Sequence, residues 1–488
     1  MKNNLPTILL LLLFPIFTIG QAKEANLLGR WFDNSLVGSN NHDNAYNEIW
    51  GYATKGYEYA IIGSTAGTHF IDVTDPQNPF EAHFVAGAVQ GGVIIHRDFH
   101  DYQGYLYAVA DEGNRSTLQI MDLRNLPESV NVVYDQSDIF RTAHNIFIDS
   151  LSAKLYALST RGDANGYAPM RVFDLGNPTQ PIEIGAYRNF GGIRPSHVHD
   201  AYVEDDIAFL NLGFDGMAIV DFRNMDNPTT LGTVTSYPNQ GYNHSGWLAA
   251  DCSHYYMADE NHGFDLKVIN TEALCDPEVG QTFDAEVDNP TSITHNQVVA
   301  CDYLYVSYYY DGLRVYDISD AANPELVQYY DTYELPNGRQ YRGAWGVYPF
   351  LPSGNILVSD MQSGLFVFES MGDNCASQRS SASSCVRSRL CQTTSTTNPL
   401  FLEAVDIFPN PIHVSTSLIV NLPATLSDLQ ISLHTTDGQQ LQNWQFDKLT
   451  VQTGEVALNL PESLSKGVYL LSLRSTSFVA TKKLVVAE

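Results

Sequence analysis

The chain has 488 residues, and its 55 acidic residues outnumber its 26 Lys and Arg, which gives a formal net charge of −29. This charge opposes binding to nucleic acid or to an anionic membrane surface, because contacts with phosphate groups require clustered cations. The length suits one large repeat domain with an appendage, and 28 Tyr and 23 Phe favour β-structure.

The first residues predict export. An apolar run at residues 8–14 follows a basic residue, and Gly20 and Ala22 offer cleavage positions. We therefore expect residues 1–20 to be a signal peptide. The run is shorter than the roughly 20 apolar residues of a membrane-spanning helix, and no later stretch reaches that length, so we expect no transmembrane segment after the signal is removed.

An internal repeat organises residues 24–371. One copy contains four short strand-like segments, at 294–300, 303–307, 311–318 and 323–329, separated by turns. Copies open 44 to 55 residues apart at Trp50, His100, His144, His199, His244, His295 and Trp345. Four strands at a period of about 40–50 residues are typical of a propeller blade. The sequence therefore predicts an all-β chain with a seven-bladed β-propeller at 24–371.

The last copy lacks its fourth strand. It stops after the segment at 364–369, whereas residues 26–32, ahead of the first copy, resemble fourth-strand segments such as 182–187. A closed ring leaves no open sheet edge between its first and last blades. We expect residues 26–32 to pair with 364–369 and complete the last blade as a clasp.

The third strands resemble a known repeat. The segments at 312–320 and 216–222 are similar to the LVIVD repeat. Together with a signal peptide and an exchangeable C-terminal anchor, they resemble the bacterial choice-of-anchor B family. This resemblance implies a propeller at the cell surface and supplies no agreed biochemical activity.

Residues 372–402 are rich in Ser, Thr and Cys, and we expect a flexible linker there. An even number of cysteines in an exported chain predicts disulfides. We expect one bridge among Cys252, Cys275 and Cys301, and a local one near the linker, where the other three cysteines lie.

Residues 403–488 predict a separate small β-sandwich, because short alternating strands are divided by turns. The Phe-Pro-Asn-Pro sequence at 408–411, Gly-Val-Tyr at 467–469 and the final Lys-Lys-Leu-Val-Val at 482–486 resemble the type A C-terminal sorting domain of the type IX secretion system of Bacteroidota. The resemblance implies the type IX machinery as a partner, passage through the periplasm, and a secreted or outer-surface location. An ordinary adhesive sandwich is the rival interpretation.

The repeat-opening residues form the main candidate site. The first strand of each blade lies innermost, so Trp50, His100, His144, His199, His244, His295 and Trp345 would share one level of the channel mouth. Three roles stay open: capping of the blades, a ligand-binding mouth, or a metal or catalytic centre.

A transition metal would be held by His144, His199, His244 and His295, and His96, His197 and His262 keep this alternative open. The residues that follow the ring histidines vary between acidic, amide and hydroxyl types, which favours a turn preference over a designed set of carboxylate partners.

Other chemistry is weaker. Asp-rich turns at 72–75 and 317–320 could hold calcium, although Asp is also a common turn former. The tyrosines at 308–310 could stack on sugars or peptides, or could pack inside a blade. We identify no catalytic residues and expect no cofactor.

The leading hypothesis is a non-enzymatic binding or display protein for an extracellular protein, peptide or glycan. The alternatives are a secreted metal-dependent enzyme that uses the histidine ring, and a structural surface-layer component.

Overall fold

The computed structural model describes residues 22–162, 166–372, 384–390, 406–413, 417–421, 429–435, 440–446, 455–461, 464–474 and 479–487. The predicted signal peptide lies outside these residues. The chain divides into two compact units, residues 1–390 and 391–488. Strands make up nearly all the regular structure, which confirms the all-β prediction, and within the described part no helix is long and apolar enough to cross a membrane.

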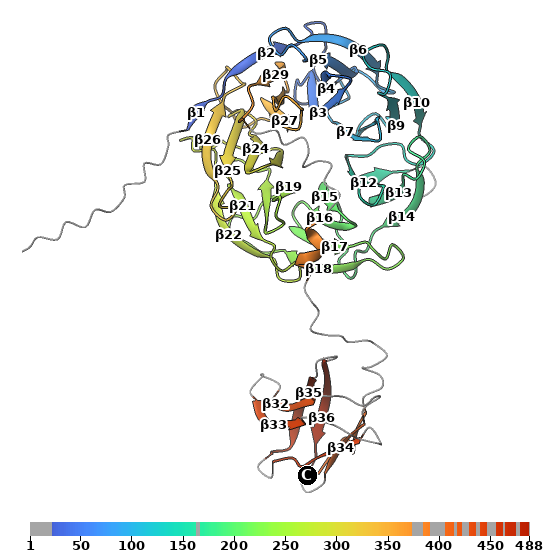
Figure 1. Cartoon of the computed structure of the whole chain (residues 1–488), viewed down its shortest axis with the longest axis vertical. Helices are drawn as coiled ribbons and strands as arrows, with labels where there is room; N and C mark the ends of the chain where they lie inside the picture. The colour runs from blue at the N-terminus through green and yellow to red at the C-terminus, as the bar shows by residue number, and fades with distance from the viewer. Residues whose placement is uncertain are drawn as a thin grey trace, which may run out of the picture. The chain divides into compact units, whose positions relative to one another are not determined.

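The described residues of the first unit form seven sheets that follow one another around a ring (Figure 1). The first four sheets, each in spatial order, are β3 (Tyr46–Thr54), β4 (Tyr57–Ser64), β5 (Gly67–Asp72) and β6 (Phe80–Ala86); β7 (Arg97–Tyr102), β8 (Tyr105–Ala110), β9 (Leu118–Asp122) and β10 (Asn131–Gln136); β11 (Asn145–Asp149), β12 (Lys154–Arg161), β13 (Tyr167–Asp174) and β14 (Ile182–Tyr187); and β15 (Asp200–Glu204), β16 (Ile207–Asn211), β17 (Met217–Asp221) and β18 (Thr229–Val234).

Two of the other three sheets include a strand from the N-terminus. The three sheets are β19 (Asn243–Leu248), β20 (His254–Asp259), β21 (Leu266–Asn270) and β22 (Glu278–Phe283); β23 (Gln297–Ala300), β24 (Tyr303–Ser307), β25 (Leu313–Asp317) and β26 (Glu325–Tyr330) with β1 (Lys23–Glu24); and β27 (Ala344–Tyr348), β28 (Ile356–Asp360) and β29 (Gly364–Phe368) with β2 (Leu27–Trp31).

The first strand of every sheet lies next to the central channel. Each of these strands contacts the first strand of the following sheet, and β27 contacts β3, so the circle closes. The second and third strands are buried on both faces between neighbouring sheets, as β16 and β17 illustrate. Their sequences are therefore continuous apolar runs, while a fourth strand such as β10 is largely exposed.

The predicted clasp is present. Strand β2 pairs antiparallel with β29, with Leu27 opposite Phe368 and Trp31 opposite Leu365. Strand β1 also pairs, in parallel, with β26. The N-terminal residues thus connect the last two sheets.

The linker differs from its prediction at residues 384–390, which pack on the first unit. Val386, in the short helix α1 (Val386–Arg389), is completely buried in a hydrophobic cluster of the fourth and fifth sheets. The backbone N–H of Leu274 donates to the carbonyl of Arg389 at 3.0 Å, and Arg387 pairs with Asp205. This segment, which we call the strap, is therefore not a flexible tether.

Cys252 has a disulfide partner outside the first three cysteines. It is bonded to Cys385 of the strap, 133 residues away, and not to Cys275 or Cys301. Cys275 and Cys301 are themselves disulfide-bonded. The pairing depends on the docking of the strap, which brings the linker against β20 and its neighbours.

The second unit has two sheets, β30-β31-β34 and β33-β32-β35-β36. Their strands are β30 (Asp406–Phe408), β31 (Leu418–Asn421), β32 (Leu429–Thr435), β33 (Gln440–Phe446), β34 (Glu455–Leu458), β35 (Gly467–Arg474) and β36 (Val479–Val486). Alternate residues such as Leu429, Ile431 and Leu433 are buried in one core. This is the predicted β-rich tail.

Candidate functional site

Six side chains form a ring at one level of the channel, which we call the histidine level. Adjacent ring centroids lie 4.0 to 5.3 Å apart around the circle. The members are His96, His144, His199, His244, His295 and Trp345. Five of the seven predicted ring residues are thus brought together.

Trp50 and His100 are not part of this ring, which corrects the prediction. They contact each other, with ring centroids 4.5 Å apart, and lie at a different level of the channel. The second sheet contributes His96 in place of His100, because His96 directly precedes β7 just as His144 directly precedes β11. Comparing positions relative to the first strand of each repeat would have identified His96.

Hydrogen bonds orient the ring histidines. Nδ1 of His199 donates to the carbonyl of His244 at 2.9 Å, and Nδ1 of His295 donates to the carbonyl of Trp345. A carbonyl can only accept, so each of these Nδ1 atoms carries a proton.

Two carboxylates face the other side of the ring. Nδ1 of His144 lies 3.0 Å from Asp111 Oδ2, and Nδ1 of His96 is bonded to Glu112. Ordered partners for the histidines therefore do exist, contrary to our expectation, but they come from the residues after β8 and not from those that follow each histidine.

His144 and His199 are hydrogen-bonded to each other. Their Nε2 atoms are 2.8 Å apart, while both Nδ1 atoms face oxygen atoms. Burial opposes the charged form of Asp111, but the hydrogen bond to His144 outweighs burial and lowers the pKa of Asp111.

The pKa values of the ring histidines are shifted in different directions. Burial, reinforced by neighbouring histidines, holds the pKa values of His199 and His244 well below the usual value, and burial lowers the pKa of His295 to about 3. Burial also opposes the charged form of His96, but the bond to Glu112 outweighs it and raises its pKa. Neutral imidazoles, the form that binds metals, are therefore present on one side of the ring.

Two groups at this level could hold a metal ion. In each, among the described residues, all three ligand atoms lie within 4.8 Å of one another. The groups are His244, Glu260 and His295, and His96, Asp111 and His144. The predicted metal set is divided between them, and His199 belongs to neither group.

The two remaining candidate histidines, His197 and His262, have hydrogen-bond partners outside the ring. His197 is bonded through Nδ1 to Ser159 and through Nε2 to the Tyr242 hydroxyl, at 2.7 and 2.8 Å. His262 Nδ1 donates to the carbonyl of Thr291.

Three carboxyl groups occupy the middle of the channel, around a cavity of about 70 Å³. Burial, with a contribution from Asp98, raises the pKa of Glu48 to about 8 and that of Asp200 to about 8. Burial also raises the pKa of Asp98 to about 7. The side-chain amides of Asn145 and Asn296 donate to Asp200 and Glu48, at 3.3 and 3.0 Å.

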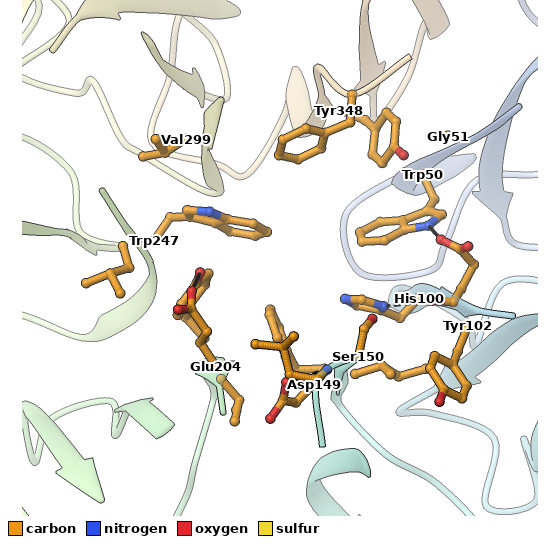
Figure 2. Close-up of a pocket in the computed structure, with 18 of the residues that line it drawn as sticks. Trp50, Gly51, His100, Tyr102, Asp149, Ser150, Glu204, Trp247, Val299 and Tyr348 are labelled. Carbon is orange, nitrogen blue, oxygen red and sulfur yellow. Dashed lines mark hydrogen bonds between the residues drawn. The ribbon is translucent and has the colours of Figure 1, made fainter. Parts of the chain in front are cut away.

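The other end of the channel opens into a cavity of about 800 Å³, which we call the aromatic mouth. Figure 2 shows the indole rings of Trp50 and Trp247 on opposite sides of it. The further aromatic lining residues are Tyr52, His100, Tyr102, Phe147, Tyr202, Tyr348 and Phe350. The sequence repeat did not reveal this site, because only Trp50 and His100 of its lining were among the repeat-opening residues.

The charged side chains of the mouth are all acidic. Asp101, Asp149 and Glu204 line it, and none of its described lining residues is Lys or Arg. Asp101 accepts the indole N–H of Trp50 at 2.9 Å, and Glu204 accepts the Tyr202 hydroxyl at 2.8 Å. The mouth thus offers aromatic faces and hydrogen-bond acceptors.

The Asp-rich turns and the three consecutive tyrosines were the other candidate sites. Asp72 and Asp317 accept backbone N–H groups of their own turns, at 2.9 and 2.8 Å, as turn-forming residues do. Tyr308, Tyr309 and Tyr310 are at most 2% exposed, so they pack inside the propeller and do not offer an exposed stacking surface.

Comparison with known families identifies two parts of the chain. Residues 406–487 match the model described as a secretion system C-terminal sorting domain, and residues 294–332 match the LVIVD repeat. The tail is a type IX sorting domain. The protein is therefore exported and is either secreted or displayed at the cell surface.

No curated protein matches the sequence. Among solved structures, the chain is similar to PorZ, an essential bacterial surface component of the type IX secretion system of Porphyromonas gingivalis, with 12% identity and a TM-score of 0.44. The match covers 94% of this chain and 61% of that one. It is also similar to the Cps50 (Swd1) β-propeller domain of Myceliophteria thermophila, with 10% identity, a TM-score of 0.48, and coverage of 70% and 98%. Similarity at this level carries no inference about function.

Proposed function

We propose that the protein is a non-enzymatic extracellular binding protein that takes a neutral saccharide into the aromatic mouth. The observation that carries the proposal is the cavity of about 800 Å³ with an indole ring on each of two opposite sides. A cavity of this size is in the usual range for ligand sites, which combine apolar walls with a few polar groups.

The chemistry of the lining selects the ligand class. Apolar faces of a sugar ring can lie against indole faces, while sugar hydroxyls can donate to the carboxylate of Glu204. The absence of cationic side chains from the described lining, and the net charge of −29, oppose phosphorylated or otherwise anionic ligands.

The test is binding of the full chain to an array of neutral and anionic glycans and to a peptide library, followed by titration with the best ligand. We expect Trp50→Ala and Trp247→Ala each to weaken binding by about tenfold or more, because central aromatic anchors supply much of the binding energy. Phe80→Ala is the matched control, since Phe80 is an exposed aromatic residue of β6 outside the cavity.

Two outcomes would refute the proposal. Binding that is unchanged in both Trp variants would place the ligand elsewhere, and selective binding of peptides would assign a different ligand class. A chain that binds nothing in either library would favour a purely structural surface role.

A further inference from the structure

We propose that His244, Glu260 and His295 bind one divalent first-row transition metal ion at the histidine level. This site goes beyond saccharide binding, because its residues do not line the aromatic mouth. The three ligand atoms lie within 4.8 Å of one another, and the side chains of His244 and Glu260 are 4% and 15% exposed. Two imidazoles and one carboxylate are a common ligand set for such ions.

Two of the three ligands are oriented by a neighbour. His295 donates from Nδ1 to the carbonyl of Trp345, so its Nε2 carries the lone pair that a metal requires. The hydroxyl of Tyr309 donates to Glu260 Oε1 at 2.7 Å, which holds the carboxylate and leaves Oε2 facing His244.

The atoms at this site leave a gap that a cation would fill. Glu260 Oε2 lies 4.0 Å from His244 Nε2, too far for a hydrogen bond. Two atoms bound to one metal at about 2.0–2.1 Å are about 3–3.4 Å apart, so a small movement would let both reach an ion. Nδ1 of the buried His244 has no hydrogen-bond partner among the described residues.

The second group at this level is less suited to a metal. There Asp111 is already bonded to His144, and His144 is hydrogen-bonded through Nε2 to His199. A metal at that position would have to replace these hydrogen bonds. At the proposed site, His244 Nε2, His295 Nε2 and Glu260 Oε2 have no hydrogen-bond partner within the described part of the chain.

The ligand chemistry defines the class of metal. Imidazole ligands favour Zn²⁺, Cu²⁺, Ni²⁺ and Fe²⁺ over Ca²⁺ and Mg²⁺, which prefer oxygen ligands. The ring of His199 lies beside the site, with its centroid 4.0 Å from that of His244.

The experiment uses the full chain without a histidine tag, stripped with a chelator and dialysed against Zn²⁺ or Co²⁺ separately. We expect elemental mass spectrometry to find close to one equivalent per chain after dialysis, and Co²⁺ to give visible absorption bands of a nitrogen-ligated centre. Retention of no metal above the level of a protein without such a site would overturn the proposal.

Variants then locate the ion. Glu260→Gln and His295→Ala should each weaken Co²⁺ affinity by at least about tenfold. His100→Ala is the matched control, since His100 is another buried channel histidine, outside the histidine level, and should leave affinity unchanged. Thermal unfolding of every apo variant checks folding, and metal should raise the Tm of the wild type and of His100→Ala only.

A different result would contradict the assignment. If Asp111→Asn abolished binding while Glu260→Gln did not, the ion would belong to the other group. If all variants bound Co²⁺ as the wild type does, the ion would lie outside the histidine level.

Discussion

The carboxyl groups of Glu48, Asp98 and Asp200 bind protons more tightly in the folded state than in the unfolded chain. Their pKa values, about 8, 7 and 8, lie above those of the same groups in an unfolded chain. The folded state therefore binds more protons than the unfolded state between about pH 4 and pH 8. This contribution to stability is complete below about pH 4 and is lost as the pH rises through the folded pKa values.

Asparagine at Asp98 and Asp200 should flatten this pH dependence. We expect the wild type to lose stability between pH 5 and pH 8, and the double variant Asp98→Asn/Asp200→Asn to lose less, because its amides cannot ionise. Urea unfolding at the two pH values measures the difference. Asp226→Asn, at an exposed position, should behave as the wild type, and parallel profiles for all three proteins would contradict the pKa assignment.

The ion pair of Lys267 and Asp259 is completely buried, with 2.8 Å between Nζ and Oδ2. Lys267→Met should reduce the free energy of unfolding by about 3–5 kcal/mol, because it leaves the Asp259 charge without its cation. Chemical denaturation measures the loss. Lys55→Met removes a cation from an exposed pair with Glu128 and should have little effect; equal effects of the two substitutions would be inconsistent with this interpretation.

Residue positions within the site were only partly predictable. The ring histidines could be found because each opens a repeat, whereas His100 was assigned to the wrong level because the second copy is degenerate. Glu260 follows β20 in a connecting loop, where the repeat pattern does not predict which way a side chain points. Its place beside His244 follows from the pairing of β19 with β20, which sets Asp259 opposite Asn243.

At the scale of elements, the clasp depends on close approach at Gly29. A Cβ added there would come within 2.1 Å of the carbonyl oxygen of Pro76, which is backbone and cannot move aside easily. Gly29→Val should therefore displace β2 from β29 and lower the Tm, with faster amide exchange at residues 364–368. Arg30→Ala keeps the backbone and removes side-chain contacts such as that of Arg30 with the Phe366 ring, so it should have a smaller effect. Unchanged exchange in Gly29→Val would show that β2 does not protect the last sheet.

The strap should depend on its disulfide. In Cys252→Ser/Cys385→Ser we expect trypsin to cleave after Arg387 and Arg389 sooner than in the wild type, because the lost cross-link no longer holds residues 384–390 on the propeller. Limited proteolysis with mass spectrometry detects these sites. Equal cleavage rates would mean that the buried Val386 and the pair of Arg387 with Asp205 hold the strap without the disulfide.

Elements with a regular pattern were predictable, and those fixed by tertiary contacts were not. Strands such as β16, β17 and β35 follow from apolar runs bounded by turns. Strand β33 has no such pattern, because its residues are mainly polar and exposed. The strap was missed because a four-residue helix has no stability of its own and forms against the fourth and fifth sheets.

At the scale of the whole molecule, the proposed function assigns recognition to the first unit, while the second unit carries the sorting domain. Deletion of residues 403–488 should leave the protein in the periplasm, because the sorting domain is the part read by the secretion machinery. Cell fractionation with surface labelling measures this. Normal surface delivery of the truncated protein would contradict the role of the tail.

The all-β architecture and the type of tail could be predicted from the sequence because both rest on repeated local patterns. The aromatic mouth could not, since it is assembled by first strands that are up to about 300 residues apart in the chain, as for Trp50 and Tyr348. Only closure of the ring brings those side chains to one place.

The disulfide between Cys252 and Cys385 also has a mechanical consequence. If the C-terminal part is held at the cell surface while the propeller is pulled by a ligand or by flow, the tension passes along the covalent chain to Cys385 and enters the fifth sheet at Cys252. Strand β29 and its pairing with β2 are thereby spared the load that they would carry if the chain continued directly from residue 368. The cross-link shields the seam of the ring from forces that would unzip it.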